Sequence, residues 1–400
     1  MNVLFLTLVN IRSLEERNIY TDLLRAFSAH GHTVYAVSPA ERRLGEETCL
    51  LKEGGGAVLR VRTGNIQKTN LIEKGISTVL LESQFIAAIR RYLADVKFDL
   101  VLYSTPPVTL AKAVQFVKKR DGAMSYLLLK DIFPQNAVDL GMMQKTGPKS
   151  VLYRFFRSKE KNLYALSDRI GCMSRANVDF LCTHNPDIDP EKVEVCPNSV
   201  EPENKEITPQ RRAQLREKYG VPQDQTVFIY GGNLGRPQGI PFLIDCLRAA
   251  AEKPERFFVI CGTGTEYPKL KAYVDAEKPA NVLLINGLPK ADYEDFVAAC
   301  DVGLIFLDYR FTIPNFPSRL LSYMQSGLPV ICCTDPNTDM GDIAEAGGFG
   351  WKCMSNDVSA FCRAVDAAME ADLSAMGAVG KQYLLEHYTA EEGYRIITGK

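Results

Sequence analysis

The stretch FIYGGNLGRPQGI, residues 228–240, joins an apolar run typical of a buried strand to a segment with the pattern of a helix. Its four glycines keep the turn free of Cβ atoms, and a helix is expected to begin near Pro241. Backbone N–H groups and the positive end of the helix dipole then face the space beyond the strand, where they can bind an anion. The stretch fits neither the P-loop nor G-x-G-x-x-G, so a tight strand–helix turn without a ligand is the alternative.

The alternation of strand and helix in this stretch continues along the whole chain. Amphipathic segments separate the apolar runs, and this order predicts an α/β fold with parallel sheets covered on both faces. The runs typical of strands are 3–9, 33–38, 99–104, 124–129 and 169–174, followed by 226–232, 257–262, 281–287, 302–307 and 329–334.

One polar, proline-bearing segment, residues 195–214, interrupts the alternation, and we place a linker there. The predicted architecture is two Rossmann-like, doubly wound domains that face each other across a cleft. Their predicted bounds are residues 1–203 and 204–382. The last segment, 383–400, is predicted to cross back to the first domain.

Composition excludes several classes of protein. The formal net charge is −1, which argues against nucleic acid as a partner. The start MNVLFLTLVNIRSLEE is read as a first strand rather than a signal peptide, and no apolar run has the length of a membrane span. The 11 cysteines are odd in number and lack C-x-x-C spacing, which favours reduced thiols in a cytosolic protein. The 4 histidines form no metal-ligand pattern.

A second stretch with the character of an anion site is RFTIPNFPSRLLSYMQSGLPVI, residues 310–331. Ser318 is predicted to cap a helix whose first turn carries Arg319. A cation there opposes the helix dipole at a cost of about 0.3–1 kcal/mol, so a bound anion would explain it. Two anion sites in one domain suggest a diphosphate. The alternative is that Arg319 points into water.

Two further strand ends of the second domain are followed by glycines. They lie in ICGTGTEYPKLKAYV (260–274) and NVLLINGLPKADYEDFVAACDVGLIF (281–306). In the second of these, a flat base could lie against the backbone of Gly287, Leu288 and Pro289.

In this order, GGNLGRPQGI, CGTGTEYPKLKAY, INGLPKADYEDF, CDVGLIFL and FPSRLLSYMQSGLPVI resemble the donor domain of family 4 of the retaining, GT-B-fold glycosyltransferases, with bacterial capsule and O-antigen transferases closest. AFSAHGHTVYAVSP and VEVCPNSVE resemble segments of the first domain of such enzymes, so the resemblance covers nearly the whole chain. It implies a nucleoside-diphosphate sugar as donor, transfer with retention, and neither metal nor cofactor. The predicted donor-binding residues are Gly232, Asn233, Leu234, Arg236, Gln238, Gly262, Thr263, Gly264, Gly287, Leu288, Pro289, Thr312, Ile313, Asn315, Phe316, Ser318, Arg319 and Ser322.

The chain departs from the usual pattern of that family at four positions. The family's donor loop has an arginine and a lysine where this chain has Asn233 and Gln238. Its pair of glutamates falls on Pro314 and Ser322. A subgroup of polysaccharide transferases resembles this version, in which the arginines of the two loops supply the positive charge. The contacts to the ribose and to the donor-sugar hydroxyls stay unassigned.

The most unusual segment of the first domain is LLLKDIFPQNAVDLGMM, residues 127–143. Related transferases have D-x-[WF]-P there, so Asp131 is predicted to orient the acceptor as an acid or base. The alternatives are that it caps the following helix or pairs with Lys130. The predicted acceptor-side residues after the first strand are Asn10, Arg12 and Glu16, where a solvated helix start is the alternative.

A basic and aromatic segment, GPKSVLYRFFRSKEKNLYALSDR (147–169), fits an anionic membrane surface or, alternatively, a core face with a solvated back. The predicted acceptor is a glycan or is linked to polyprenyl diphosphate. A membrane would suit the lipid-linked acceptor and would place the chain at the inner face of the plasma membrane. The D-x-D of Asp187 and Asp189 binds metal in other glycosyltransferases; here it lies far from the donor stretches and is attributed to chance.

The sequence thus predicts a retaining glycosyltransferase of bacterial surface polysaccharide synthesis. One alternative is a non-catalytic subunit that binds sugar nucleotides in an assembly complex. Another is a sugar-nucleotide epimerase, which the absence of clustered acidic and histidine residues disfavours.

Overall fold

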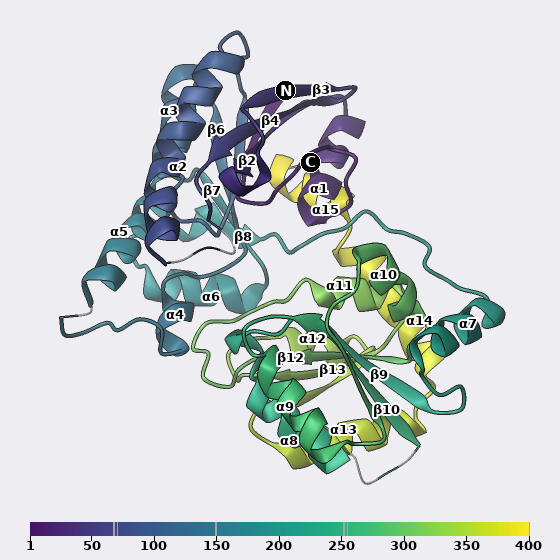
Figure 1. Cartoon of the computed structure of the whole chain (residues 1–400). Coiled ribbons are helices and arrows are strands. Elements are labelled where there is room, and N and C mark those ends of the chain that lie inside the picture. Colours follow the sequence, from purple (N-terminus) through teal and green to yellow (C-terminus); the bar gives the residue numbers. More distant parts are fainter. Residues whose placement is uncertain (67–68, 70, 149, 251–252, 254, 400) are drawn as a thin grey trace. The chain divides into compact units, whose positions relative to one another are not determined.

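The computed structural model describes residues 1–66, 69, 71–148, 150–250, 253 and 255–399. The chain forms two compact units (Figure 1). The first comprises Met1–Glu201 with Ala390–Lys400, and the second comprises Pro202–Thr389. The boundary lies slightly before the predicted one, and the segment that returns to the first unit begins at Ala390 rather than at residue 383.

The first unit is built on an eight-stranded sheet with the order β3-β4-β2-β1-β5-β6-β7-β8. Its strand pairs are parallel except for the antiparallel pair of β3 and β4. The strands are β1 (Asn2–Leu6), β2 (Thr33–Glu41), β3 (Cys49–Glu53), β4 (Gly56–Thr63), β5 (Leu100–Ser104), β6 (Met124–Leu129), β7 (Arg169–Cys172) and β8 (Val193–Val195).

Helices cover both faces of this sheet (Figure 1). On one side α2 packs on α3, which packs on α5, and on the other α1 packs on the C-terminal α15. The side chains of Tyr394 and Ile397 of α15 are buried against Leu23 and Phe27 of α1, so the end of the chain belongs to this core. The helices are α1 (Ile19–Ala29), η1 (Arg42–Leu44), α2 (Leu71–Tyr92), α3 (Ala111–Asp121), α4 (Gln135–Asp139), α5 (Ser150–Leu166), α6 (Arg175–His184), η2 (Pro190–Lys192) and α15 (Ala390–Thr398).

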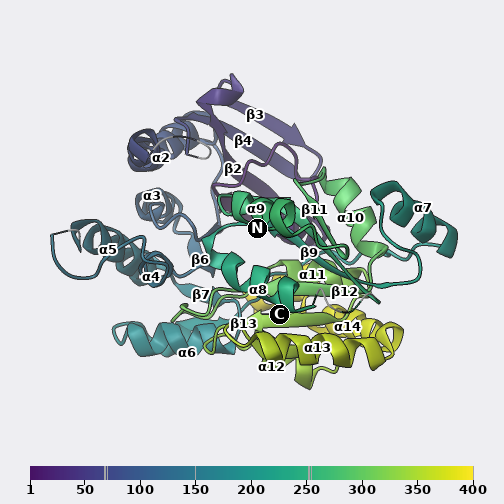
Figure 2. The ribbon, with the colours of Figure 1, turned by 60° about the horizontal axis from the view of Figure 1, so that its bottom comes forward.

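The second unit has a six-stranded, all-parallel sheet with the order β11-β10-β9-β12-β13-β14 (Figure 2). This is the strand order of a dinucleotide-binding doubly wound fold. The strands are β9 (Thr226–Asn233), β10 (Arg256–Thr263), β11 (Val282–Ile285), β12 (Val302–Phe306), β13 (Val330–Thr334) and β14 (Gly350–Met354). The helices are α7 (Pro209–Tyr219), η3 (Arg236–Gln238), α8 (Ile240–Ala250), α9 (Tyr267–Glu277), α10 (Lys290–Ala298), α11 (Arg319–Gln325), α12 (Met340–Ala346), α13 (Val358–Glu370) and α14 (Leu373–His387).

None of the helices in the described part of the chain has both the length and the hydropathy to cross a membrane. The 11 cysteines are free thiols, and most of them are buried.

The last residues of the neighbouring strands β9 and β10 approach so closely that glycine is required there. A Cβ atom on Gly262 would lie 2.0 Å from the carbonyl oxygen of Gly232. We therefore expect Gly262→Ala to lower the free energy of unfolding by about 1–3 kcal/mol, because backbone must move to admit the methyl group. Chemical denaturation measures this, with Gly54→Ala as the control for replacing a glycine where a Cβ atom meets nothing. An unchanged midpoint for Gly262→Ala would show that the ends of β9 and β10 separate easily.

Candidate active site

The carboxyl ends of β9 and β12 form the switch point of the second sheet. The two strands are neighbours, but the chain leaves β9 toward β10 through α8 and leaves β12 toward β13 through α11. Ligands of doubly wound sheets bind beyond the strand ends at such a point. Both predicted anion-binding loops, residues 233–239 and 307–318, begin there.

Arg319, the first residue of α11, brings a cation to this point. Its guanidinium lies 4.2 Å above the ring of Tyr230, a residue of β9. Its Nη2 lies 3.4 Å from the position that a Cβ atom on Gly232 would take. Its Nη1 is buried and has no hydrogen-bond partner among the residues that the structure describes. A buried guanidinium N–H without an acceptor is costly, so the site favours an anion.

Ser318, which precedes this helix, does not cap it. The prediction of a capping side chain was wrong, because the backbone of Ser318 already has helical dihedral angles and its side chain is exposed. Ser322, one turn further along α11, is half-buried.

Two tyrosines that the sequence argument did not single out complete the surroundings of Arg319. The Tyr323 hydroxyl accepts a hydrogen bond from the Gly231 N–H (3.2 Å) and lies 3.1 Å from the carbonyl oxygen of Ile229. The Tyr293 hydroxyl fills the space beside Gly231 that a Cβ atom would need. Burial raises the pKa of Tyr323 to about 12, so its phenol stays neutral. The signal in the sequence was the spacing of Tyr323, one helical turn after Arg319.

The loop after β9 is held by its own residues. The Gln238 Oε1 accepts hydrogen bonds from the Gly235 N–H (3.0 Å) and from the Asn233 side chain (3.1 Å). The Leu234 side chain is buried in the core, and its N–H donates to the carbonyl of Thr263 (2.8 Å). Gln238 and Leu234 therefore shape the loop, whereas Gly232 and Asn233 lie exposed at its surface.

Arg236 lies in η3, before α8, and not in the first turn of that helix. Its side chain is exposed, and no partner for it is found within the described part of the chain. α8 itself begins at Ile240, whose side chain is buried. Of the two arginines predicted to hold a diphosphate, Arg319 is thus fixed in place and Arg236 is free to reorient.

The loop after β12 is anchored by buried side chains and by the turn after β13. Ile313 and Phe316 are buried, and Thr312 is exposed. The Thr338 hydroxyl donates to the carbonyl of Asn315 (2.6 Å). The Asn315 Nδ2 is a second buried donor without a partner in the described residues. Ile313 and Phe316 therefore position the loop by packing, and Asn315 offers a polar group.

The loops after β10 and β11 contact each other beside this point. A Cβ atom on Gly264 would meet the carbonyl oxygen of Leu234 at 2.3 Å, and one on Gly287 would meet the Thr263 side chain at 2.9 Å. Backbone packing thus accounts for these glycines without a ligand. Leu288 is half-buried, and Pro289 precedes the first residue of α10.

In the first unit, Asp131 follows β6 and is held firmly. The Thr105 hydroxyl donates to its carbonyl (3.0 Å) and accepts from its N–H (3.2 Å). The Asn136 side chain donates to both carboxylate oxygens, at 2.9 and 2.8 Å. Burial of the carboxyl group raises the pKa of Asp131 to about 6, against hydrogen bonds from the Ile132 N–H and Asn136 that lower it. A carboxyl group poised near neutral pH can serve as acid or base.

Both structural alternatives for Asp131 are wrong. α4 begins after Pro134, and no side chain caps it. The Lys130 ammonium donates to the carbonyls of Cys196 (3.3 Å) and Pro197 (3.1 Å) instead of pairing with Asp131. Burial, and to a lesser extent the Asp131 charge, raise the pKa of Tyr20, which places this phenol near the carboxylate.

The predicted acceptor-side residues take part in a polar network within the first unit. Asn10 accepts a hydrogen bond from the buried Arg60, which also donates to Glu46 (2.7 Å). The Arg12 guanidinium donates to the Glu46 carboxylate (2.5 Å), and the backbone N–H of Arg12 donates to the Glu16 carboxylate (3.0 Å). Asn10, Arg12 and Glu16 thus shape the loop between β1 and α1, and their contact with an acceptor stays a prediction.

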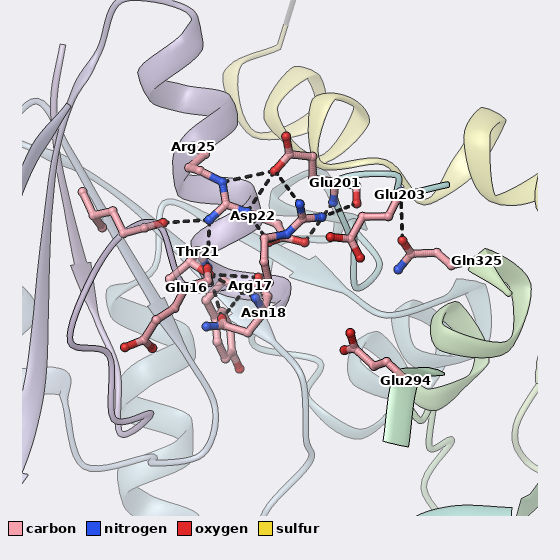
Figure 3. A network of polar contacts seen from close by, with 12 residues as sticks. Glu16, Arg17, Asn18, Thr21, Asp22, Arg25, Glu201, Glu203, Glu294 and Gln325 are labelled. Carbon is pink, nitrogen blue, oxygen red and sulfur yellow. Dashed lines mark hydrogen bonds and ion pairs between the residues drawn. The ribbon is translucent and has the colours of Figure 1, made fainter. Parts of the chain in front are cut away.

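The same loop is tied to the end of the first unit (Figure 3). Arg25 donates to the carbonyl of Glu16 (2.9 Å) and to the carboxylate of Glu201 (2.9 Å). The Glu201 N–H donates to the buried Asp22 (3.0 Å), and Arg17 donates to the Glu201 carbonyl (2.7 Å). This network fixes the last residue of the unit before the chain passes into the second one.

Within the described ranges, no group of three or more His, Cys, Asp or Glu side chains is arranged to hold a metal ion. The two aspartates of the D-x-D have structural partners: Asp189 caps η2 through the Glu191 N–H (3.0 Å), and Asp187 lies 3.6 Å from Lys161.

Both units are similar to known glycosyltransferases. Residues 18–204 match the family described as Glycosyltransferase Family 4, and residues 211–381 match Glycosyl transferases group 1. A probable glycosyltransferase of Pseudomonas aeruginosa, WbjE, is 26% identical over 329 residues, which cover 80% of this chain and 78% of that protein. Sucrose-phosphate synthase of Thermosynechococcus elongatus shares the fold at a TM-score of 0.76 and 14% identity, over 100% of this chain and 98% of that one. HepE of Anabaena, solved in complex with UDP, also shares the fold. Its TM-score is 0.69 and its identity 14%, over 100% of this chain and 99% of that one. The chain belongs to the family 4 glycosyltransferases and has their GT-B fold.

Proposed function

We propose that this glycosyltransferase moves a sugar from a nucleoside-diphosphate sugar to a glycan or a polyprenyl-diphosphate-linked acceptor, with retention and without a metal. The reaction belongs to the synthesis of a bacterial surface polysaccharide such as capsule or O-antigen. It takes place in the cytoplasm, at the inner face of the plasma membrane. HepE has been solved with UDP and with UDP-glucose, which supports a nucleotide-sugar donor.

The observation that carries the proposal is the buried Nη1 of Arg319, at the switch point of the second sheet, which has no hydrogen-bond partner among the described residues. The diphosphate of the donor gains negative charge as the glycosidic bond breaks. A fixed guanidinium beside the β9 loop therefore stabilises the transition state more than the ground state. Asp131 would orient the acceptor hydroxyl from the first unit.

The test is turnover of a panel of UDP-, GDP-, ADP- and dTDP-sugars. Turnover is measured as the release of the nucleoside diphosphate. The anomeric configuration of the product, read by NMR, decides between retention and inversion. Slow hydrolysis of one donor without acceptor is expected. If no donor binds and none turns over, the proposed transfer is wrong.

Chelation of divalent cations tests metal independence. We expect EDTA to leave the rate of sugar transfer unchanged, because the diphosphate charge is met by Arg319 and by backbone N–H groups. The rate is compared before and after dialysis against EDTA, and again after Mg²⁺ or Mn²⁺ is restored. A loss that only the added metal reverses would contradict the prediction.

One observation favours a second candidate, a non-catalytic sugar-nucleotide-binding subunit. The two positions of the family's glutamate pair are the buried Pro314 and the half-buried Ser322, so neither offers a carboxylate to the donor. Tight binding of a sugar nucleotide, without turnover even when acceptors are supplied, would favour this candidate over the enzyme.

A further inference from the structure

An apolar groove in the first unit lies between the end of α4 and the start of α5. Its volume is about 660 Å³, and its lining includes Met142, Met143, Pro148, Val151, Leu152 and Phe155. Four of these side chains are also well exposed: Met142 (61%), Val151 (63%), Leu152 (52%) and Phe155 (42%). Isolated apolar side chains are common on protein surfaces, but a contiguous group around a groove marks a contact with another apolar phase.

The first turns of α5 lie at the surface of the first unit. The residues of α5 that are buried are Ser150 and, in its second half, Glu160, Leu163 and Tyr164. The intervening turns carry the exposed apolar side chains, and this part of the helix lies at the periphery of the first unit in both views (Figures 1 and 2).

The charge around the groove is of one sign. Residues 140–159 contain no aspartate or glutamate, in a chain whose formal net charge is −1. The cations of this segment are Lys145, Lys149, Arg154, Arg157 and Lys159. Arg157 pairs with Glu160, and Lys149 lies outside the described residues. Lys145 and Arg154 are exposed, and Lys159 lies 5.7 Å from the ring of Phe155. Cations beside exposed apolar groups complement an anionic lipid surface.

The groove is also connected to the candidate catalytic residue. Phe155 contacts Phe156 with ring centroids 5.2 Å apart, and Phe156 contacts Phe133 edge-on at 5.0 Å. Phe133 follows Asp131 closely in the segment after β6. An acceptor whose lipid stays in a bilayer at the groove would thus have its polar end on the side of the protein that carries Asp131.

We propose that the α4–α5 face, residues 140–148 and 150–159, inserts its apolar side chains into the interface of an anionic phospholipid bilayer. The inference deepens the proposed function, on which it rests for the lipid-linked acceptor, by naming the surface that brings the enzyme to that acceptor. The binding itself needs no donor and no reaction.

Flotation of the full chain with vesicles tests the proposal. Wild type is expected to float with vesicles of phosphatidylcholine and phosphatidylglycerol in equal parts, and to lose affinity as phosphatidylglycerol is omitted. Each cation near the surface contributes roughly fivefold to partitioning, so Arg154→Glu is expected to lose at least about fivefold. Leu152→Glu is expected to lose about 10- to 150-fold, because it removes one buried leucine and adds a negative charge.

Leu385→Glu is the matched control, since Leu385 lies on a helix of the second unit and is 44% exposed. It should float like wild type. Val151→Ser provides a second, milder variant in case Leu152→Glu unfolds. Wild type that stays with the dense fraction, or a Leu152→Glu variant that floats as wild type does, would overturn the proposal. So would a dimer that Leu152→Glu converts to a monomer without any change in flotation, since the face would then join two copies of the chain.

Donor hydrolysis by the same variants, measured without vesicles, separates this inference from the proposed function. Leu152→Glu and Arg154→Glu are expected to keep donor hydrolysis while they lose flotation. A wild type that hydrolyses the donor but does not float would overturn the membrane contact alone. Flotation of a chain that turns over no donor would leave the membrane contact standing and refute the transfer reaction.

Discussion

Asp131→Asn is expected to lower kcat/KM for sugar transfer by about 10²–10⁴-fold, the range for loss of a positioned acid or base. Asparagine keeps the shape of the side chain and can still accept a hydrogen bond from Asn136, so the loss reports the proton and the charge. Initial rates with donor and acceptor at several concentrations give the value. Asp187→Asn is the control, because that aspartate is exposed and its replacement changes the net charge equally. Equal losses in both variants, or none in Asp131→Asn, would remove Asp131 from the site.

The pH dependence gives a second signature of Asp131. If the ionised carboxylate orients the acceptor, kcat/KM of the wild type rises through about pH 6 and is level above it. The residual activity of Asp131→Asn should lack this step. A wild-type profile without an inflection near the pKa of Asp131 would contradict its role as a base.

Stability should move in the opposite direction from activity. The pKa of Asp131 is higher in the folded chain (about 6) than the ordinary value of 3.8, so the folded form binds the proton more tightly. The stability that this proton contributes is therefore lost as the pH rises from about 4 to above 6. At neutral pH the buried charge costs up to about 3 kcal/mol, and Asp131→Asn is expected to recover part of it. Chemical denaturation of both forms at acidic and neutral pH measures the difference. A structural carboxylate would give a less stable variant instead.

The fold was predictable from hydrophobic pattern wherever strands are buried on both faces. The ten apolar runs named from the sequence all form strands of the two parallel sheets. The strands that the pattern missed are β3, β4, β8 and β14. β3 and β4 form an antiparallel hairpin at a sheet edge, where β3 is mostly exposed and its sequence is correspondingly mixed. β8 is short, and β14 is an edge strand carrying the half-buried Trp351 and Lys352. Edge strands need fewer apolar residues, so the periodicity of β3, β8 and β14 is weak. β4 is paired on both sides and mostly buried, and its apolar run is broken by Arg60 and Arg62.

The site was predictable as far as loops and helix starts can be read from glycine, proline and charge. Arg319 was proposed because a cation in a first helical turn is unusual in itself. Asp131 was proposed because it follows a strand end and resembles the D-x-[WF]-P of related transferases. Tyr293 was missed because its contact with Gly231 joins residues far apart in the sequence. The sequence pattern could not distinguish residues that would contact a ligand from residues that shape the loop. Gln238 is an example, because its side chain turns back to accept a hydrogen bond from the loop's own backbone.

The second large effect is expected for Arg319→Ala, which should lower kcat/KM by about 10²–10³-fold, the range for removing one preorganised donor from a developing oxyanion. The guanidinium is held over Tyr230, and its buried Nη1 has no acceptor in the described part of the protein, so little reorganisation is needed when a diphosphate binds. Arg319→Lys should recover part of the rate, since it keeps the charge but loses the planar fork.

Calorimetry measures the affinity of the Arg319→Ala variant for UDP, and steady-state kinetics with the preferred donor measure its kcat/KM. If the contact strengthens as charge develops on the leaving diphosphate, Arg319→Ala loses more in kcat/KM than in affinity for UDP. Arg310→Ala is the matched control, because Arg310 belongs to the same loop but is exposed and paired with Asp308 (2.7 Å). The cation–π contact with Tyr230 contributes about 0.5–2 kcal/mol to folding, so thermal unfolding without ligand is recorded for each variant. Wild-type kinetics in a folded Arg319→Ala variant would place the diphosphate elsewhere, and the transfer mechanism built on this arginine would fail with it.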